Sequence, residues 1–333
     1  RAIMLMRQAA FLVILAFALS ACQSVGWQLL QVESSPPPLA DGRAVYDTAT
    51  DSALLFGGVT SDNKLSDQTW EWNGETWSQI FPDRHPKARS KQAMAYDPVR
   101  KKIVLFGGWD GKSVFNDTWE WNGKDWKQIK PKHPPAARCC HAMAYAGDLK
   151  KIILYGGWDS AKGVFYNDVW AWDGKDWHEM DSTGLPQLSG HAMQELPARN
   201  EIVSISSTRY VNSWIFSEEQ WTDLGINPNP TRSEGRSAYD SLNDLVVYFG
   251  GIKDGELQND TWAFDGQNWY LLNLRPAPSG RFGHVMFYDP MRKAVILFGG
   301  LDSTKYYNDT WSLSLPNDIS TLILPTPVQT STP

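Results

Sequence analysis

Short stretches of the chain alternate between apolar and polar residues with a period of two, as in QAMAYD (92–97), IVLFGG (103–108) and TWEWNG (118–123). This period is typical of β-strands, because successive side chains point to opposite faces of a strand. No helical stripe is present beyond the extreme N-terminus of the sequence. The pattern therefore predicts an all-β protein made of many short strands.

These strands recur in a repeating unit, which is most complete in KIVLFGGWDGKSVFNDTWEWNGKDW (102–126) and KIILYGGWDSAKGVFYNDVWAWDGKDW (151–177). The first glycines of the repeated doublets are Gly57, Gly107, Gly156, Gly250 and Gly299. Their spacings are 50, 49, 94 and 49 residues, so the wide gap contains one degenerate copy, with Ser206 and Ser207 in place of the glycines. Six units follow.

Each unit contains four predicted strands. A turn sequence lies between the third and fourth strands, at Asn73-Gly74, Asn122-Gly123, Asp173-Gly174 and Asp265-Gly266. Such pairs predict two-residue hairpin turns with positive φ at both central positions. One four-stranded sheet cannot bury both of its faces, so units of this length must stack around an axis. The sequence predicts a six-bladed β-propeller with four antiparallel strands per blade.

The first strand of each unit indicates how the blades pack. In the second unit Met94 and Tyr96 alternate with Ala93 and Ala95, so that a large face can nest on the small face of the next blade. The chain has 17 Trp residues, and we expect most of them to fill this core between blades.

The two ends of the chain are expected to close the ring. The last unit has no fourth strand opening with Trp, whereas GWQLLQVESSPPP (26–38) is similar to DWKQIKPKHPP (125–135). We therefore expect residues 27–33 to pair with the strand at 310–315, with Trp27 in the place of Trp126. An open ring would leave a free strand edge, which invites aggregation.

The glycine doublet, the NDTW or NDVW tetrad and the Trp that follows resemble kelch repeats. The resemblance covers residues 27–315 and implies a kelch β-propeller. Because unrelated activities occur on one fold, it does not by itself imply a function.

The first residues have the form of a bacterial lipoprotein signal peptide. Arg7 precedes an apolar run that is too short for a comfortable membrane span, and Leu19-Ser20-Ala21-Cys22 resembles a lipobox. This resemblance implies cleavage before Cys22 and acylation of its thiol. We expect residues 1–21 to be a signal peptide and residues 22–26 an anchor and tether, outside the cytoplasm at the outer membrane or cell surface. A plain secreted protein and an uncleaved anchor are the alternatives.

Composition excludes one class of partner. The formal net charge is −6, and it becomes more negative once Arg1 and Arg7 are removed with the signal peptide. No basic stripe suits nucleic acid, so we expect none as a partner. Residues 316–333 are expected to form a mobile tail rich in Thr and Pro.

Histidines and cysteines are candidate metal ligands. His141, His191 and His284 occupy one equivalent position in three blades, and Gln92 occupies it in a fourth. Neutral imidazoles at one height could bind zinc or copper, but packing and backbone hydrogen bonding explain the position without a metal. Cys139 and Cys140 are adjacent, so a disulfide between them would be strained and two thiols are favoured over it. We expect no metal and no cofactor.

The candidate ligand-binding residues lie at one end of the ring. Four arginines recur three residues before the histidine position, at Arg89, Arg138, Arg232 and Arg281. They could bind a carboxylate at the channel mouth, or each could pair with a nearby Asp or carbonyl and stabilise the crossing between blades. The loops after the doublets carry many aromatic residues, including Trp109, Trp158, Tyr166 and Tyr307. These side chains could stack on sugars, grip a peptide or pack inward.

Three classes of function remain. The first is a lipid-anchored binding module that holds a protein or glycan on the loop end of the ring, and it needs no feature beyond those present. The second is an enzyme, since sialic-acid mutarotases are also extracytoplasmic six-bladed kelch rings with a carboxylate ligand. No motif identifies an acid or base, although Glu195 and Glu234 lie near first-strand positions. The third is an envelope scaffold. We expect binding rather than catalysis.

Overall fold

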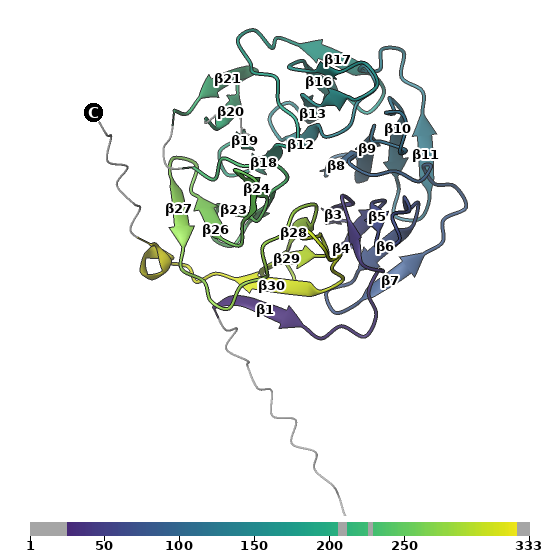
Figure 1. Cartoon of the computed structure of the whole chain (residues 1–333). Coiled ribbons are helices and arrows are strands. Elements are labelled where there is room, and N and C mark those ends of the chain that lie inside the picture. Colours follow the sequence, from purple (N-terminus) through teal and green to yellow (C-terminus); the bar gives the residue numbers. More distant parts are fainter. Residues whose placement is uncertain (1–24, 206–211, 226–228, 325–333) are drawn as a thin grey trace, which may run out of the picture.

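Six antiparallel sheets of four strands surround a central channel, as the computed structural model in Figure 1 shows. It describes residues 25–205, 212–225 and 229–324. The strands in each blade run in sequence order from the channel outwards, except in the last blade, where β1 (Gly26–Leu30) is outermost. The predicted all-β, six-bladed propeller is confirmed.

The blades have the following strands. Blade 1 contains β3 (Arg43–Asp47), β4 (Ser52–Phe56), β6 (Thr69–Trp72) and β7 (Trp77–Ile80). Blade 2 contains β8 (Ala93–Asp97), β9 (Lys102–Phe106), β10 (Thr118–Trp121) and β11 (Trp126–Ile129). Blade 3 contains β12 (Ala142–Ala146), β13 (Lys151–Tyr155), β16 (Val169–Trp172) and β17 (Trp177–Met180).

The second half of the ring repeats this arrangement. Blade 4 contains β18 (Ala192–Leu196), β19 (Glu201–Ile205), β20 (Trp214–Ser217) and β21 (Gln220–Asp223). Blade 5 contains β22 (Arg236–Asp240), β23 (Leu245–Phe249), β26 (Thr261–Phe264) and β27 (Trp269–Leu272). Blade 6 contains β28 (Val285–Asp289), β29 (Ala294–Phe298), β30 (Thr310–Ser314) and β1.

The two ends of the ring differ. The loop face contains the crossings between blades and the loops after the glycine doublets, where three small two-stranded sheets form: β2 (Leu39–Ala40) with β5 (Val59–Thr60), β14 (Trp158–Asp159) with β15 (Val164–Phe165), and β24 (Ile252–Lys253) with β25 (Glu256–Leu257). The turn face contains the turns between first and second strands and between third and fourth strands. A short 3-10 helix, η1 (Ser320–Leu322), follows the ring.

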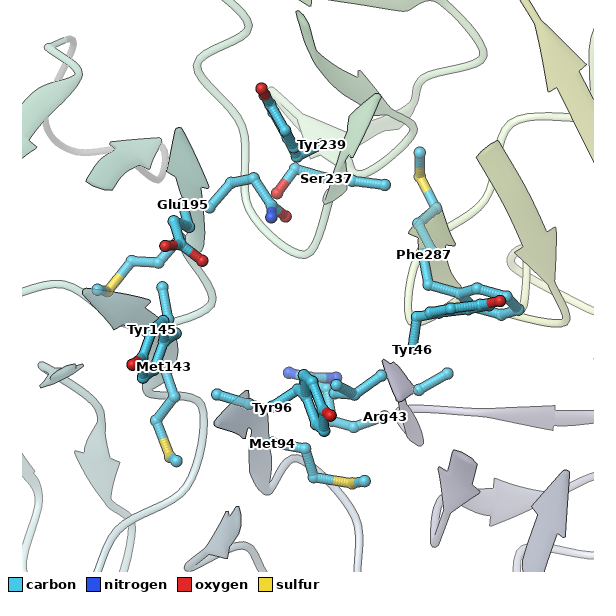
Figure 2. Close-up of a pocket in the computed structure, with 18 of the residues that line it drawn as sticks. Arg43, Tyr46, Met94, Tyr96, Met143, Tyr145, Glu195, Ser237, Tyr239 and Phe287 are labelled. Atoms are coloured by element: carbon cyan, nitrogen blue, oxygen red, sulfur yellow. The ribbon is translucent and has the colours of Figure 1, made fainter. Parts of the chain in front are cut away.

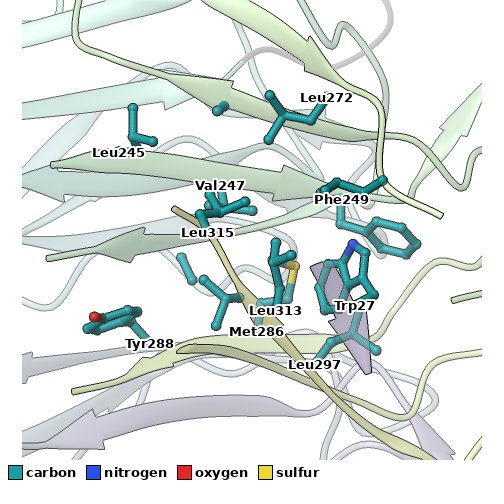
Figure 3. Packing of buried hydrophobic residues seen from close by; sticks show 14 residues of the cluster. Trp27, Leu245, Val247, Phe249, Leu272, Met286, Tyr288, Leu297, Leu313 and Leu315 are labelled. Atoms are coloured by element: carbon teal, nitrogen blue, oxygen red, sulfur yellow. The ribbon is translucent and has the colours of Figure 1, made fainter. Parts of the chain in front are cut away.

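The N-terminal strand closes the ring as predicted. β1 pairs antiparallel with β30, with Gly26 opposite Ser314 and Leu30 opposite Thr310. The indole of Trp27 is buried beside Phe249 of blade 5 at a ring-centroid distance of 5.3 Å (Figure 3). Its N–H donates to the Thr261 hydroxyl at 2.9 Å. Blade 6 thereby gains a fourth strand from the opposite end of the described chain.

Small and large side chains interlock between blades, also as predicted. Ala93 and Ala95 of blade 2 share a buried cluster with Met143 and Tyr145 of blade 3. Ten of the Trp side chains are buried, and several fourth-strand indoles donate to a third-strand threonine of the previous blade. One example is Trp126, which donates to the Thr69 hydroxyl at 3.2 Å. Burial of these aromatic groups accounts for much of the apolar area that holds neighbouring blades together.

The predicted two-residue turns are wrong. Trp72 pairs with Trp77, so the connection between these third and fourth strands has four residues, and positive φ occurs at Gly74 but not at Asn73. The Asn73 side chain instead accepts hydrogen bonds from the amides of Glu75 and Thr76, both at 2.9 Å. The side-chain bonds stabilise a longer loop, which the dipeptide pattern alone does not distinguish from the shorter one.

Several expectations concern residues outside the described ranges. These are the signal peptide, the lipidation of Cys22, the Ser206-Ser207 pair and the end of the tail. In the part of the chain that is described, no helix is long and apolar enough to cross a membrane.

Candidate functional site

The four predicted arginines are built into the loop face. Arg89 is fully buried and binds Asp117 of the NDTW tetrad through both terminal nitrogens, at 2.6 and 2.8 Å. It also donates to the carbonyl of Gly107 at 2.9 Å, and the indole N–H of Trp119 donates to the same Asp117 carboxylate at 2.7 Å. The equivalent pairs are Arg138 with Asp168, Arg232 with Asp260, and Arg281 with Asp309. Of the two alternatives for these arginines, the structure shows the ion pair that stabilises the crossing.

The predicted loop aromatics divide into two groups. Tyr166 and Tyr307 each lie under a buried guanidinium, with Arg138 and Arg281 at 4.0 Å from the ring centroids. They therefore support the ion pairs through cation–π contacts. Trp109 and Trp158 remain partly exposed. Trp158 stacks on Phe165 across the β14–β15 hairpin, with centroids 5.7 Å apart and planes within 14°.

The three histidines pack between blades. His141, His191 and His284 are buried, and each ring lies edge-on against an aromatic ring of the preceding blade. Burial lowers the pKa of all three, to about 3 for His191. Among the described residues, no three His, Cys, Asp or Glu side chains are grouped as a metal site.

Cys139 and Cys140 are both free thiols, with their sulfur atoms 3.1 Å apart and both side chains buried. A hydrogen bond from its neighbour lowers the pKa of Cys139, and the same contact raises the pKa of Cys140.

The channel contains a cavity of about 460 Å³ (Figure 2), lined by the first strands of all six blades. Its lining near the turn face includes Thr48, Pro98, Ser241 and Pro290, and its lining toward the loop face includes Arg43, Arg236, His141 and His191. Methionines and alanines form much of the wall between these ends, including Met94, Met143, Met193 and Met286. The middle of the cavity is therefore largely apolar, and its loop-face end carries Arg43 and Arg236.

A ring of six backbone positions surrounds the channel beyond the charged end of the cavity. It consists of Asp41, Lys91, Cys140, Gly190, Glu234 and Gly283, which we call the belt. All six have φ between 57° and 69°. Five backbone hydrogen bonds of 2.7–3.0 Å link consecutive members, each amide donating to the carbonyl of the preceding blade. Because each member needs left-handed backbone, glycine is the expected residue.

Four belt positions nevertheless have a side chain, and three of these side chains are charged. Left-handed backbone costs a non-glycine residue about 1 kcal/mol or more. Such strain is often found where a side chain has a function, so it marks Asp41, Lys91 and Glu234 as candidates. Sequence reasoning identified Glu234 but not the other two.

The charged belt side chains form a cluster with Arg236 of the cavity wall. The Lys91 ammonium lies 3.7 Å from the Asp41 carboxylate and 3.9 Å from that of Glu234. Arg236 lies 3.2 Å from Glu234 and 3.8 Å from Asp41. Arg236 is 8% exposed, and its Nε has no hydrogen-bond partner among the described residues. The Arg236 guanidinium is thus not fully hydrogen-bonded by the described residues.

Arg43 adds a third cation to this end of the cavity. One of its terminal nitrogens donates to the carbonyl of Gly42 at 2.9 Å, and no carboxylate in the described ranges forms an ion pair with it. Burial and the charge of Arg236 lower its pKa to about 10, so it is still a cation at neutral pH. The cluster contains three cations, Arg43, Lys91 and Arg236, and two carboxylates, so one positive charge is in excess.

The opposite end of the cavity is a ring of tyrosines interrupted by one acid. Five blades have a Tyr at the equivalent first-strand position, namely Tyr46, Tyr96, Tyr145, Tyr239 and Tyr288, whereas blade 4 has Glu195. Burial, followed by the nearby charge of Asp148, raises the pKa of Glu195 to about 7. Figure 2 shows Glu195 between Tyr145 and Tyr239 on the wall of the cavity. This carboxyl group can exchange a proton near neutral pH.

A signal for the missed residues is visible when the six units are aligned by their first strands. Gly190 and Gly283 mark the belt position in two units, and the other units have Asp, Lys, Cys and Glu there. Arg43 and Arg236 stand where Ala93 and Ala142 are found in other blades. A charged residue at a position that otherwise suits Gly or Ala indicates a role beyond packing.

Comparison with known proteins supports the repeat assignment. Residues 15–203 match the protein family described as "KLHDC2/KLHL20/DRC7 Kelch-repeats domain", which is more than half of the chain. A solved structure titled "Structure of YjhT" superposes with a TM-score of 0.66, covering 85% of this chain and 97% of that chain at 16% identity. At this identity the likeness concerns the fold alone. None of the curated proteins in the comparison matches the chain.

Proposed function

Since the chain belongs to this kelch-repeat family, whose propellers commonly serve as interaction modules, we propose that it is a lipid-anchored binding protein for a small acidic molecule. The ligand occupies the central cavity, with its acidic group at the end lined by Arg43 and Arg236. Cys22 carries the lipid and holds the ring outside the cytoplasm of a bacterial cell.

The excess positive charge at the end of the cavity is the observation on which this proposal depends. Arg236 is buried and Arg43 is half-buried, so an unbalanced positive charge here is unfavourable and a bound anion would neutralise it. Guanidinium groups match a planar carboxylate especially well, because two parallel N–H groups can donate to its two oxygens. Arg43 and Arg236, rather than the four loop arginines, are available for this contact.

The rest of the cavity indicates the remainder of the ligand. A volume of about 460 Å³ is within the usual range for small-molecule sites. The arginine and tyrosine levels are three residues apart along each first strand, or about 10 Å. Methionine side chains between them adapt to irregular apolar shapes. We expect a molecule with one carboxylate and an apolar or ring-shaped body of about this length.

Calorimetric titration tests the proposal with a panel of sugar acids and aromatic acids, each compared with its neutral amide. An acid that binds should lose about tenfold or more in affinity as the amide, and likewise after Arg43→Gln or Arg236→Gln. Lys64→Gln is the matched control, because it removes a cation whose side chain is 79% exposed on the loop face. Equal binding of acid and amide by every variant would contradict the proposal.

Anchoring has a separate test. Expression of Cys22→Ala in a bacterium should move the protein from the membrane fraction to the soluble fraction and abolish its labelling by fatty acid. Unchanged fractionation and labelling would exclude the lipid anchor without affecting the ligand site.

A second candidate function is recognition of a protein or glycan at the loop face, and the stacked Trp158 and Phe165 favour it. Phe165 is 42% exposed and lies on a hairpin at the edge of this face. Flat exposed aromatic groups can stack on sugar rings or grip apolar side chains. Capture from envelope extracts and a glycan panel should weaken after Trp109→Ala together with Trp158→Ala. Equal capture by both forms would exclude this surface.

A further inference from the structure

Three turns between first and second strands have a large apolar residue at an exposed position on the turn face. The side chains of Val99, Leu242 and Met291 are 59%, 48% and 72% exposed. Each is the third residue after the first-strand tyrosine of its blade. Polar and small residues usually fill such turns, so three large apolar side chains at one end of the ring indicate a contact surface.

These turns are well defined. The side chain of Asp97 accepts hydrogen bonds from the amides of Val99 and Arg100, both at 3.0 Å. Asp289 accepts equivalent bonds from Met291 and the residue that follows it, and Asp240 accepts one from Leu242. The apolar side chains are therefore held in solvent by ordered turns rather than by flexible loops.

The three turns surround the turn-face end of the central cavity. Their neighbours Pro98, Ser241 and Pro290 belong to its lining. The exposed apolar side chains are thus distributed around the channel axis, in blades 2, 5 and 6. A flat surface placed across this end of the ring could contact all three.

The N-terminal strand also starts at the turn face. Gly26 pairs with Ser314, the last residue of β30, whereas Thr310 at the other end of β30 pairs with Phe298 beside the glycine doublet of the loop face. Val25, just before β1, is 52% exposed. Cys22 precedes Gly26 by four residues, which span at most about 14 Å. A lipid on Cys22 can therefore reach a membrane at the turn face, whereas the loop face lies beyond the full length of a blade.

From this arrangement we propose that the turn face rests on a phospholipid surface, with Val99, Leu242 and Met291 inserted among the head groups and upper acyl chains. The proposal rests on the proposed anchoring through Cys22, which brings this face to the membrane. At one equivalent turn position the blades have Lys101, Lys150 and Lys293 against Asp51 and Asp244, with Asn200 in blade 4. Because the net charge of this position is only +1, we expect insertion to depend mainly on the apolar side chains rather than on anionic lipid. The loop face points away from the membrane.

Photo-cross-linking tests this orientation. The chain from Cys22 onward, which keeps every strand of the ring, is coupled through the Cys22 thiol to a maleimide lipid in phosphatidylcholine vesicles. The two other thiols are buried, so they compete poorly for the maleimide. Benzoylphenylalanine replaces Val99, Leu242 or Met291 in separate variants. The control is Phe81→benzoylphenylalanine, since Phe81 is apolar, 80% exposed and follows β7 on the loop-face side.

After irradiation, mass spectrometry should show several-fold more lipid adduct at each turn-face position than at position 81. Adding phosphatidylglycerol should change this ratio little. Equal labelling at both faces, or stronger labelling at position 81, would overturn the proposal. In this experiment chemical coupling of Cys22 to a lipid replaces natural acylation. A failure of natural lipidation is therefore detected only by the fractionation of Cys22→Ala. It can be distinguished from a failure of the turn face to contact the membrane.

Discussion

The indole N–H of Trp27 donates to the hydroxyl of Thr261 at 2.9 Å, although 234 positions separate the two residues in the chain. The same bond joins Trp126 to Thr69, Trp177 to Thr118 and Trp77 to Thr310. Trp27 therefore occupies the place of an ordinary fourth-strand tryptophan. Its position indicates that blade 6 is packed like the blades made from one continuous segment.

Trp27→Phe should destabilise the ring as much as Trp126→Phe. Each change leaves a buried threonine hydroxyl without its donor, at a cost of about 1–3 kcal/mol. Equilibrium unfolding in urea measures both variants, with Trp109→Phe as a control in a partly exposed loop. A cost for Trp126→Phe without one for Trp27→Phe would show that the closing strand adds little to stability.

The sequence predicts a contact correctly where one distinctive residue occurs at one position of the repeat. The Trp that opens each fourth strand is distinctive, so GWQLL near the N-terminus could be matched to the missing strand of blade 6. The role of Arg89 could not be determined in this way. The position of Arg89 in the repeat fits a ligand contact at the channel mouth as well as an ion pair with Asp117. Only the packing of the loops, which the sequence does not show, distinguishes these two roles.

The charged cluster was missed for a related reason. Asp41, Lys91 and Glu234 belong to three different repeats, and each by itself resembles a harmless replacement in a loop. Closure of the ring brings the three together around one channel. A site assembled from single substitutions in separate repeats has no motif of its own along the sequence.

The strained backbone of the belt leads to a second prediction. Cys140 has a φ of 60°, and Gly190 and Gly283 occupy equivalent positions. Cys140→Gly should therefore stabilise the protein by about 1 kcal/mol, because glycine adopts this conformation without a steric cost. Thermal unfolding of Cys140→Gly and of the neighbouring Cys139→Ala provides the comparison. A lower melting temperature for Cys140→Gly than for the wild type would argue against strain at this position.

His191 provides a prediction for acidic pH. Burial lowers its pKa from 6.5 to about 3, and only Glu234 opposes this shift. As the pH falls below 6.5 the unfolded chain binds a proton at this residue that the folded chain does not, so stability is lost between about pH 6.5 and 3. Gln92 shows that an amide is accommodated at the equivalent position, where its nitrogen donates to the carbonyl of Phe56 at 2.8 Å.

His191→Gln should therefore gain about 2 kcal/mol relative to the wild type between about pH 7.5 and pH 5. Urea unfolding at the two pH values measures this difference. Comparing the two pH values removes any destabilisation by the substitution that does not depend on pH. A difference between the two proteins that is the same at both pH values would contradict the assignment of a buried, neutral imidazole.

Glu195 should have the opposite pH dependence. Its pKa is raised from 4.5 to about 7, so the folded chain retains a proton that the unfolded chain loses as the pH rises through this interval. The contribution of Glu195 to stability therefore falls between pH 4.5 and 7 and is constant above it. The group is partly exposed, so solvent screening reduces the effect, and we expect about 1–3 kcal/mol.

Glu195→Gln removes this loss, so the variant should gain stability relative to the wild type as the pH rises from 4 to 8. Tyr145→Phe is the control, because burial raises the pKa of Tyr145 to about 12 and it does not titrate in this range.

If the protein also acts on its ligand as a mutarotase-like enzyme, a carboxyl group that exchanges protons near pH 7 is suited to acid–base catalysis. The turnover of a sugar acid should then follow a pKa near 7 and disappear in Glu195→Gln, while binding at Arg43 and Arg236 persists. Turnover that survives Glu195→Gln would exclude this carboxyl group as the catalyst.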